Sequence, residues 1–373
     1  MRKYKIVAGL ILIIGLFYSE VKAEERCKLL PALNDKIYFA AFPDFGGAED
    51  IVSKERIRSF EKLAKKKIVW AQFSQNWFNG LVYPKDKIKL ISDEGVIPFV
   101  RLMPRSSLEQ YKTEEKFTLE NIINGDFDKQ LNKWADDAKA HNIAIIIDFA
   151  VEMNGDWFSW SGVSNGGKIK NKYGDVNYAD GPERYRDAYR HIIDIFRARN
   201  VHNVTWFFHP NINSTPNEEW NSPKYYYPGD EYIDWIGISI YGSMYPKGKD
   251  WDTFEEILKE NYRQILEISS TKPLSILEIA VTDHHPLGEK AKWLRDAFEI
   301  IASKKYLNFK AISYWDESWD NDGVVASLKI NSSPKSLKAF QKALKNNKFT
   351  SEINFSGQEI KNNIKENNEK NYK

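Results

Sequence analysis

Short apolar segments that alternate with amphipathic stretches constrain the fold of this chain more than any other feature. The apolar runs are rich in β-branched and aromatic residues, which predicts strands. They lie near residues 37–43, 67–74, 97–103, 143–151, 204–209, 235–241, 273–280 and 309–315. The stretches between them carry apolar residues three and four positions apart, which predicts helices. These stretches lie near 48–66, 127–142, 182–200, 251–269, 288–304 and 334–346.

Alternation of strands and helices is typical of a parallel sheet covered by helices. Eight predicted strands favour an α/β fold of the (β/α)8 TIM barrel type over an open doubly wound sheet. The first predicted strand leads into Ala40-Ala-Phe-Pro-Asp-Phe-Gly-Gly47, which lacks the glycine spacing of a dinucleotide-binding loop. We therefore predict a single catalytic barrel domain that binds no nucleotide.

The two ends of the chain differ in composition from this barrel. Residues 1–23 begin with basic residues, continue with a short apolar run and end in Val-Lys-Ala, which predicts a signal peptide. The run is shorter than the roughly twenty residues that cross a bilayer. We therefore expect a secreted or periplasmic protein that has no membrane attachment after cleavage. The barrel is expected over 24–346, and the polar segment 347–373 is expected to be a disordered tail.

Composition and charge exclude several classes of partner and cofactor. The net charge is +2 without a basic stripe, which argues against a nucleic-acid partner and favours a neutral ligand. The six histidines lack zinc-binding spacing, and the acidic run 316–323 lacks the ligand order of a calcium loop. No Gly-x-Ser-x-Gly elbow is present, and the single cysteine, Cys27, cannot form an internal disulfide. We expect a monomer without cofactor or metal.

Two glutamates that close predicted strands are the candidate catalytic residues. Glu152 ends the fourth strand and precedes an Asn-Gly turn, and Glu278 ends the seventh. Either residue alone is as readily explained as a surface or salt-bridge glutamate. However, the carboxyl ends of all strands in a parallel barrel meet at one rim, so both side chains would reach the same cleft.

A pair of carboxyl groups at one rim is suited to glycoside hydrolysis. One group, protonated, acts as the acid, and the other, ionised, acts as nucleophile or base. A separation of about 5–5.5 Å implies retention of configuration and about 6.5–9.5 Å implies inversion. We expect burial against Trp157 and repulsion from Glu278 to raise the pKa of Glu152, so that it serves as the acid.

Tryptophans near the predicted strand ends favour a sugar as the ligand, because a flat indole offers a stacking surface for a pyranose ring. The chain has 12 tryptophans. Those at or just after predicted strand ends are Trp157, Trp160, Trp206, Trp315 and Trp319. Core packing is the alternative for each of them. The glycine-rich loop from Met153 to Gly181 is expected to form one wall of the cleft.

Three sequence blocks resemble glycoside hydrolase family 26, which contains β-mannanases and some mixed-linkage β-glucanases. They are 152–160 (Glu-Met-Asn-Gly-Asp-Trp-Phe-Ser-Trp), 226–237 (Tyr-Tyr-Pro-Gly-Asp-Glu-Tyr-Ile-Asp-Trp-Ile-Gly) and 273–278 (Pro-Leu-Ser-Ile-Leu-Glu). The resemblance implies a (β/α)8 barrel that hydrolyses with retention, with Glu152 as acid/base and Glu278 as nucleophile. It also implies that Tyr241 hydrogen-bonds the nucleophile and that Trp315 lies beneath the sugar.

The resemblance implies further substrate contacts, and this chain departs from the family pattern at two positions. His209 and Asn211, which end the fifth strand, would reach substrate hydroxyls. Trp157, Trp160 and Arg101 are the other candidate substrate-binding residues. The family pattern has histidine where this chain has Val151 and arginine where it has Asp148. By strand alternation Asp148 shares the inward face with Glu152, and a lone buried charge there is costly. We predict that Arg101 is its partner.

The function that these features favour is that of a retaining endo-β-glycanase acting on a neutral polysaccharide, with β-1,4-mannan as the first candidate. A β-1,3-1,4-glucanase or another exopolysaccharide hydrolase is the alternative, because no motif distinguishes mannose from glucose. A barrel that binds a polysaccharide without cleaving it is a further alternative.

Overall fold

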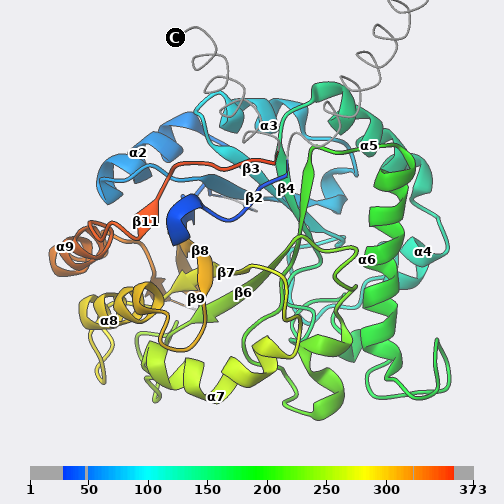
Figure 1. Ribbon diagram of the computed structural model, residues 1–373. Helices are drawn as coiled ribbons and strands as arrows, with labels where there is room; N and C mark the ends of the chain where they lie inside the picture. The colour runs from blue at the N-terminus through cyan, green and yellow to red at the C-terminus, as the bar shows by residue number, and fades with distance from the viewer. Residues whose placement is uncertain (1–27, 47–48, 322, 357–373) are drawn as a thin grey trace, which may run out of the picture.

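The computed structural model describes residues 28–46, 49–321 and 323–356, and within these ranges the chain forms a closed parallel barrel surrounded by helices (Figure 1). Each strand pairs with the next in sequence, and β1 pairs with β8 to close the barrel. The barrel strands are β1 (Ile37–Phe42), β2 (Trp70–Asn76), β3 (Ile97–Met103), β4 (Ile145–Phe149), β5 (Val204–Phe208), β6 (Trp235–Tyr241), β7 (Leu274–Ala280) and β8 (Phe309–Trp315). The predicted TIM barrel and its strand order are confirmed.

The helices form a ring outside the barrel (Figure 1). They are α2 (Lys54–Ala64), α3 (Lys85–Ser92), α4 (Leu119–Ile123), α5 (Asp128–His141), α6 (Asp180–Ala198), α7 (Phe254–Leu266), α8 (Lys290–Ser303) and α9 (Pro334–Ala343). Short 3-10 turns lie at η1 (Leu33–Asp35), η2 (Trp77–Asn79), η3 (Val163–Asn165), η4 (Glu219–Asn221) and η5 (Pro223–Tyr225). All six predicted helices are present. Helices α3 and α4 were not predicted because they are too short to show a clear apolar period.

Capping residues explain where several helices begin and end. Ser53 and Thr253 precede α2 and α7, and the side chain of each accepts a hydrogen bond from a first-turn amide. Thr253 forms a capping box with Glu256, whose side chain accepts from the Thr253 amide. Helix α5 ends at Asn142, which adopts the left-handed conformation with φ 52°. Such caps satisfy terminal backbone groups, so they fix the lengths of the helices that support the rim.

The barrel interior is filled in layers by side chains that alternate along each strand. The lower layer is apolar and largely aromatic, and it consists of Tyr38, Trp70, Phe99, Phe207, Trp235 and Leu277. The next inward positions toward the carboxyl ends are polar and buried, and they include Ser74, Arg101, Asp148, His209 and Ser239. Because the polar layer lies on a dry aromatic floor, it faces only the rim, where a ligand can enter.

The two ends of the described chain are held together below the barrel. Strand β11 (Phe349–Thr350) pairs in parallel with β1, and Leu29 forms an antiparallel bridge with Phe355. The Ser356 amide donates to the Lys28 carbonyl at 2.9 Å. Residues 347–356 are therefore ordered, and the prediction of a disordered tail from residue 347 was wrong for this part. The sequence analysis did not predict β11, because a strand of two residues is too short to show an alternating apolar pattern.

Some predicted segments lie outside the described residues. These are the signal peptide at 1–23 and the remainder of the tail at 357–373.

A small antiparallel hairpin, β9 (Ser318–Asn321) with β10 (Val324–Ser327), follows β8 at the rim. Within the described ranges no helix combines the length and the apolar character needed to span a bilayer.

Candidate active site

Glu152 lies in the turn just after β4, where the backbone holds it in a strained conformation. Ala150 and Glu152 both have positive φ, 49° and 57°. The Glu152 amide donates to the His209 carbonyl at 2.7 Å, and the Gly155 amide donates to the Glu152 carbonyl at 2.9 Å. Left-handed backbone at a residue other than glycine is costly and persists where the surroundings fix it, which is common at functional sites. The end of β5 therefore determines where the Glu152 side chain points.

A β-bulge in β7 directs Glu278 into the cleft. Ile276 is opposite Ile238 on β6, but Ser239 is opposite Glu278, so Leu277 is an extra residue. Leu277 belongs to the apolar floor of the barrel, while Ile276 and Ile279 pack outward against the helices. Simple alternation after Leu277 would point Glu278 outward as well. The bulge breaks this alternation and places Glu278 on the inner face, as bulges near active sites often do.

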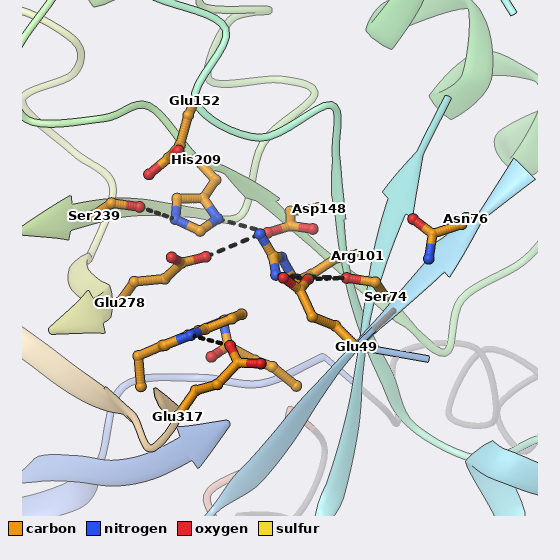
Figure 2. Close-up of polar contacts among 12 residues, drawn as sticks. Glu49, Ser74, Asn76, Arg101, Asp148, Glu152, His209, Ser239, Glu278 and Glu317 are labelled. Atoms are coloured by element: carbon orange, nitrogen blue, oxygen red, sulfur yellow. Dashed lines mark hydrogen bonds and ion pairs between the residues drawn. The ribbon is translucent and has the colours of Figure 1, made fainter. Parts of the chain in front are cut away.

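Glu278 is held by two donors. Arg101 Nη2 lies 3.0 Å from Glu278 Oε1, and the Tyr241 hydroxyl donates to Glu278 Oε2 at 2.6 Å. The hydrogen bond expected between Tyr241 and Glu278 is thus present. Arg101 also pairs with Glu49 through Nη1 at 2.8 Å, and Glu49 in turn accepts from the Ser74 hydroxyl (Figure 2). A charged guanidinium and a phenol donor both favour the ionised form of Glu278.

The two glutamates compete for a proton at this site. The pKa of Glu278 is raised to about 7, chiefly by burial. Attraction to Arg101 opposes this rise, and repulsion from Glu152 adds to it. Burial also raises the pKa of Glu152, opposed by a hydrogen bond from Ser239 and by attraction to Arg101. Only Glu278 has both the ion pair and the phenol donor. These contacts favour the negative charge on Glu278 and the proton on Glu152.

Trp157 differs in one respect from its predicted role. Its indole Nε1 donates to Glu152 Oε2 at 3.0 Å. A donor to a carboxylate favours the charged form, so Trp157 lowers the pKa of Glu152 instead of raising it. The expected upward shift of the Glu152 pKa is present, and burial is its largest cause.

Both glutamates line one cleft of about 730 Å³, which we call the catalytic cleft. Its walls include Glu152 and Glu278 with Arg101, Trp157, Asn211 and Tyr241. A neighbouring cavity of about 610 Å³ shares Tyr111 and Phe158 with it. Because Trp157 and Phe158 belong to the loop 153–181, the prediction that this loop forms one wall is confirmed.

The tryptophans divide into accessible and buried rings. Trp157 and Trp319 line the catalytic cleft and are partly exposed. Trp315 also lines the cleft but is only 2% exposed, and it stacks on Phe42 with ring centroids 4.1 Å apart. A ring that packs in this way offers its edge to a ligand more readily than its face, so Trp157 and Trp319 are the better stacking surfaces.

Two of the other tryptophans have structural contacts. Trp160 is buried, and its Nε1 donates to the Val151 carbonyl at 2.8 Å, which ties the loop to the residue before the acid. Trp206 points outward from β5 and packs against Phe196 of α6. Placing Trp206 at the rim was wrong, because alternation along β5 sends its neighbour Phe207, not Trp206, into the barrel.

Asp148 and His209 pair with each other inside the polar layer. His209 Nδ1 lies 2.7 Å from Asp148 Oδ2, and His209 Nε2 lies 3.0 Å from Ser239 Oγ (Figure 2). Both side chains are fully buried. Asp148 and Arg101 are neighbours in the β3–β4 register, but Arg101 forms its ion pairs with Glu49 and Glu278. The prediction that Arg101 is the partner of Asp148 was therefore wrong. The imidazole of His209, just after β5, pairs with Asp148 instead.

This pairing also changes the role of His209. Both ring nitrogens are engaged inside the protein, so neither is free to bind a substrate hydroxyl as expected. Asn211 does line the cleft, while its Nδ2 donates to the Asn213 carbonyl at 3.2 Å. Arg101 lines the cleft beneath Glu278.

Three important residues were not selected from the sequence. Glu49 follows β1 and anchors Arg101, and Ser239 lies opposite Glu278 on β6. Glu317 follows β8, and its Oε2 accepts from the indoles of Trp315 and Trp319 at 2.9 and 2.8 Å. Glu317 lies just beyond the end of β8, Ser239 lies in the second half of β6 and Glu49 lies in the connection after β1. A search of polar residues from the second half of each strand into the following loop would have found them.

The comparisons with known proteins agree with this geometry. The sequence profile described as "Glycosyl hydrolase family 26" matches residues 106–279, which include both glutamates. This part of the chain belongs to glycosyl hydrolase family 26. Endoglucanase H of Acetivibrio thermocellus is 28% identical over 294 residues, which are 78% of this chain and 29% of that enzyme. The chain thus spans under a third of the length of this curated relative.

Solved structures with the same barrel include two mannanases. The catalytic domain of an endo-β-1,4-mannanase from Bacillus sp. JAMB-750 superposes with a TM-score of 0.58, at 16% identity, over 84% of this chain and 87% of that domain. A double mutant of the Cellulomonas fimi endo-β-1,4-mannanase gives 0.57 at 18% identity, over 85% and 72%. At these identities the likeness shows the barrel fold and does not determine which sugar is bound.

Among the described residues, no set of three or more His, Cys, Asp or Glu side chains is arranged to hold a metal ion. The chemistry that the side chains can carry out is proton donation by Glu152 and attack by an ionised Glu278, in one cleft with partly exposed aromatic rings.

Proposed function

We propose that this family 26 enzyme cleaves a neutral β-linked polysaccharide within the chain and retains the configuration of the sugar, with Glu152 as acid/base and Glu278 as nucleophile. The observation that carries the proposal is the unequal environment of the two carboxyl groups. Glu278 has the Arg101 ion pair and the Tyr241 hydroxyl, whereas Glu152 has burial that favours its protonated form. Such a division of roles between two carboxyls is what retaining hydrolysis needs.

The reaction follows from these roles. Glu278 attacks the anomeric carbon and forms a covalent bond to the sugar, while Glu152 gives its proton to the departing glycosidic oxygen. Glu152, now a carboxylate, then takes a proton from a water molecule. That water attacks the anomeric carbon, the bond to Glu278 breaks, and both carboxyls return to their starting states. Arg101 and Tyr241 stabilise the charge of Glu278 before the attack and after its release.

An endo mode of action is supported by a second cavity beside the catalytic cleft. The catalytic cleft continues past Tyr111 and Phe158 into the neighbouring cavity of about 610 Å³. Polar and charged side chains that can hydrogen-bond sugar hydroxyls line this cavity, among them Asp156, Lys172 and Arg184. These two adjoining cavities give room for a chain longer than the sugar that is cleaved.

β-1,4-Mannan is the first candidate substrate, because the named structural neighbours are endo-β-1,4-mannanases. A mixed-linkage β-glucan is the second candidate, because the curated relative with higher sequence identity is an endoglucanase. We also propose that the protein is exported, on the pattern of residues 1–23. Amino-terminal sequencing of the protein from the culture medium or periplasm tests the export.

The test of the function is the release of new reducing ends from purified β-mannan, mixed-linkage β-glucan, β-1,3-xylan and cellulose. Cleavage of one of them identifies the substrate, and the anomeric form of the first product, followed by NMR, should show retention. Glu152→Gln should lower the rate on natural glycan by about 10²–10⁴-fold while binding survives. Glu94→Gln is the matched control, since this carboxylate pairs with Arg58 on the outside of the barrel.

Unchanged turnover in Glu152→Gln would refute the assigned acid. Binding of one of these glycans without cleavage by the unaltered protein would instead favour a binding barrel.

A further inference from the structure

Tyr111 lies at the junction of the catalytic cleft and the neighbouring cavity of about 610 Å³, and it lines both of them. It belongs to the connection between β3 and α4, and its side chain is 72% exposed. Among the described residues, its ring packs against no other aromatic ring and its hydroxyl forms no hydrogen bond. A large ring at this junction can therefore contact a ligand in either cavity.

The backbone at Tyr111 is strained. Its φ is 59°, in the left-handed region, which is an unusual conformation for a bulky residue. Its amide donates to the Trp157 carbonyl at 2.9 Å, which ties this connection to the loop that follows the acid. Strain of this kind persists where the surroundings fix it, and it is common at functional sites. The position of Tyr111 is thus set before a ligand arrives.

Glu114 holds the rest of this connection in shape. Its carboxyl oxygens accept from the Ser106 amide and hydroxyl at 2.6 and 2.7 Å. They also accept from the amides of Lys116 and Phe117 at 2.9 and 3.0 Å. Phe117 in turn packs on Trp77, with ring centroids 5.5 Å apart. A connection that is held in this way has little freedom to lose on binding, so more of the energy of a stacked sugar is retained.

The neighbouring cavity lies on the side of Glu152. Its walls come from two stretches, 111–120 and 156–184. The second stretch belongs to the loop that begins directly after Glu152 and continues into α6. No residue of β6, β7 or the connections that follow them lines this cavity, although Glu278 lies on β7. The acid protonates the oxygen of the departing sugar, so this is the side on which the departing part of a glycan is bound.

We propose that Tyr111 is a stacking platform for a sugar in the departing part of the glycan, beyond the cleaved bond, and that it makes the enzyme select long chains. A pyranose can pack on the flat face of the tyrosine ring. Lys172 and Arg184 line the same cavity and can donate to its hydroxyls. The platform rests on the proposed function, because the role of Glu152 as acid defines the departing side. It adds the substrate class, a β-glycan with several sugars beyond the bond that is cleaved.

Tyr111→Ala removes the platform but not the backbone strain, since alanine also has a Cβ. The ring lies outside the core, so the variant should fold. On mannohexaose and on a mixed-linkage β-glucan hexasaccharide we expect kcat/KM to fall about 2- to 10-fold. On nitrophenyl glycosides of the corresponding disaccharides, whose leaving group has no sugar, we expect no change. Tyr111→Phe keeps the aromatic face and should keep most of the rate on the hexasaccharides.

Tyr178→Ala is the matched control. Tyr178 is 45% exposed and belongs to the same loop as Trp157, but it lines neither cavity, so both kinds of substrate should be cleaved as before. An equal loss on both kinds of substrate in Tyr111→Ala would mean that Tyr111 acts through Glu152 and not on the glycan. An unchanged rate on the hexasaccharides would mean that the ring contacts no sugar. Either result overturns the platform.

Binding measured without turnover distinguishes the platform from the proposed function. In the Glu152→Gln background, calorimetric titration with the same two hexasaccharides should show a Kd that rises about 2- to 10-fold when Tyr111→Ala is added. Binding that depends on Tyr111, without cleavage by the unaltered protein, would support the platform and contradict the hydrolase. Cleavage by the unaltered protein, with binding that does not depend on Tyr111, would overturn the platform and leave the hydrolase in place.

Discussion

Removal of one hydroxyl group at Tyr241 is expected to move the pH range in which the enzyme works. In Tyr241→Phe the hydrogen bond of 2.6 Å to Glu278 Oε2 is lost. The ring itself can stay in place, because it lies among other cleft residues with its centroid 6.2 Å from that of Trp319. The ion pair between Arg101 and Glu278, at 3.0 Å, is not part of the change.

The size of the effect follows from the charge on Glu278. A hydrogen bond to a charged group contributes about 1.5–3 kcal/mol, which corresponds to a pKa change of about 1–2 units. The Tyr241 hydroxyl stabilises the ionised form, so its removal raises the pKa of Glu278 further above about 7. A nucleophile must be ionised to attack. The acid limb of kcat/KM should therefore move to higher pH by about 1–2 units, and the rate below that limb should fall about 10- to 100-fold.

The assay is the pH dependence of kcat/KM on the best glycan, with Tyr245→Phe as the matched control. Tyr245 lines the same cleft but is 53% exposed, so loss of its hydroxyl should leave the acid limb where it is. A folded Tyr241→Phe enzyme with an unmoved acid limb would refute the argument that Tyr241 holds Glu278 ionised.

Three further outcomes are expected. Trp157→Phe removes the 3.0 Å donor to Glu152, so the pKa of Glu152 should rise and the alkaline limb of kcat/KM should move up by about one pH unit. Burial raises the pKa of Glu317 from 4.5 to about 7, so its contribution to stability is present below pH 4.5 and is lost as the pH rises through about 7. Glu317→Gln should therefore be the more stable protein at alkaline pH by up to about 3 kcal/mol, with the advantage absent in acid, as measured by urea unfolding. In Gly181→Ala the new Cβ would lie 2.2 Å from the Gly162 carbonyl oxygen, so unfolding in urea should show a loss of about 1–3 kcal/mol; an unchanged midpoint would contradict this close packing.

The barrel and its two glutamates could be predicted because both follow from local patterns. Each strand has its own apolar run, and the rule that parallel strands end at one rim brings Glu152 and Glu278 into one cleft. The bulge in β7 could not be predicted, since an extra residue at Leu277 leaves the apolar run unbroken. It was nevertheless needed, because strict alternation would have pointed Glu278 away from the cleft.

The partners of buried charges could not be predicted for a related reason. Arg101 and Asp148 lie on β3 and β4, and His209 follows β5 directly, so several pairings satisfy the rule that a buried charge needs a partner. Which pair forms depends on differences of an ångström in side-chain reach. The strand pattern determines that these residues meet, but the arrangement of their hydrogen bonds depends on tertiary packing.

The joined ends of the described chain make this barrel a good subject for circular permutation. Lys28 and Ser356 are already hydrogen-bonded at 2.9 Å, below the strands and on the side of the barrel opposite the catalytic cleft. A short linker between these residues would close the chain into a ring without crossing the substrate path. New ends could then be opened in an exposed helix connection. For the same reason, an enzyme attached to a solid support through either of these residues would present its open cleft to a polymer in solution.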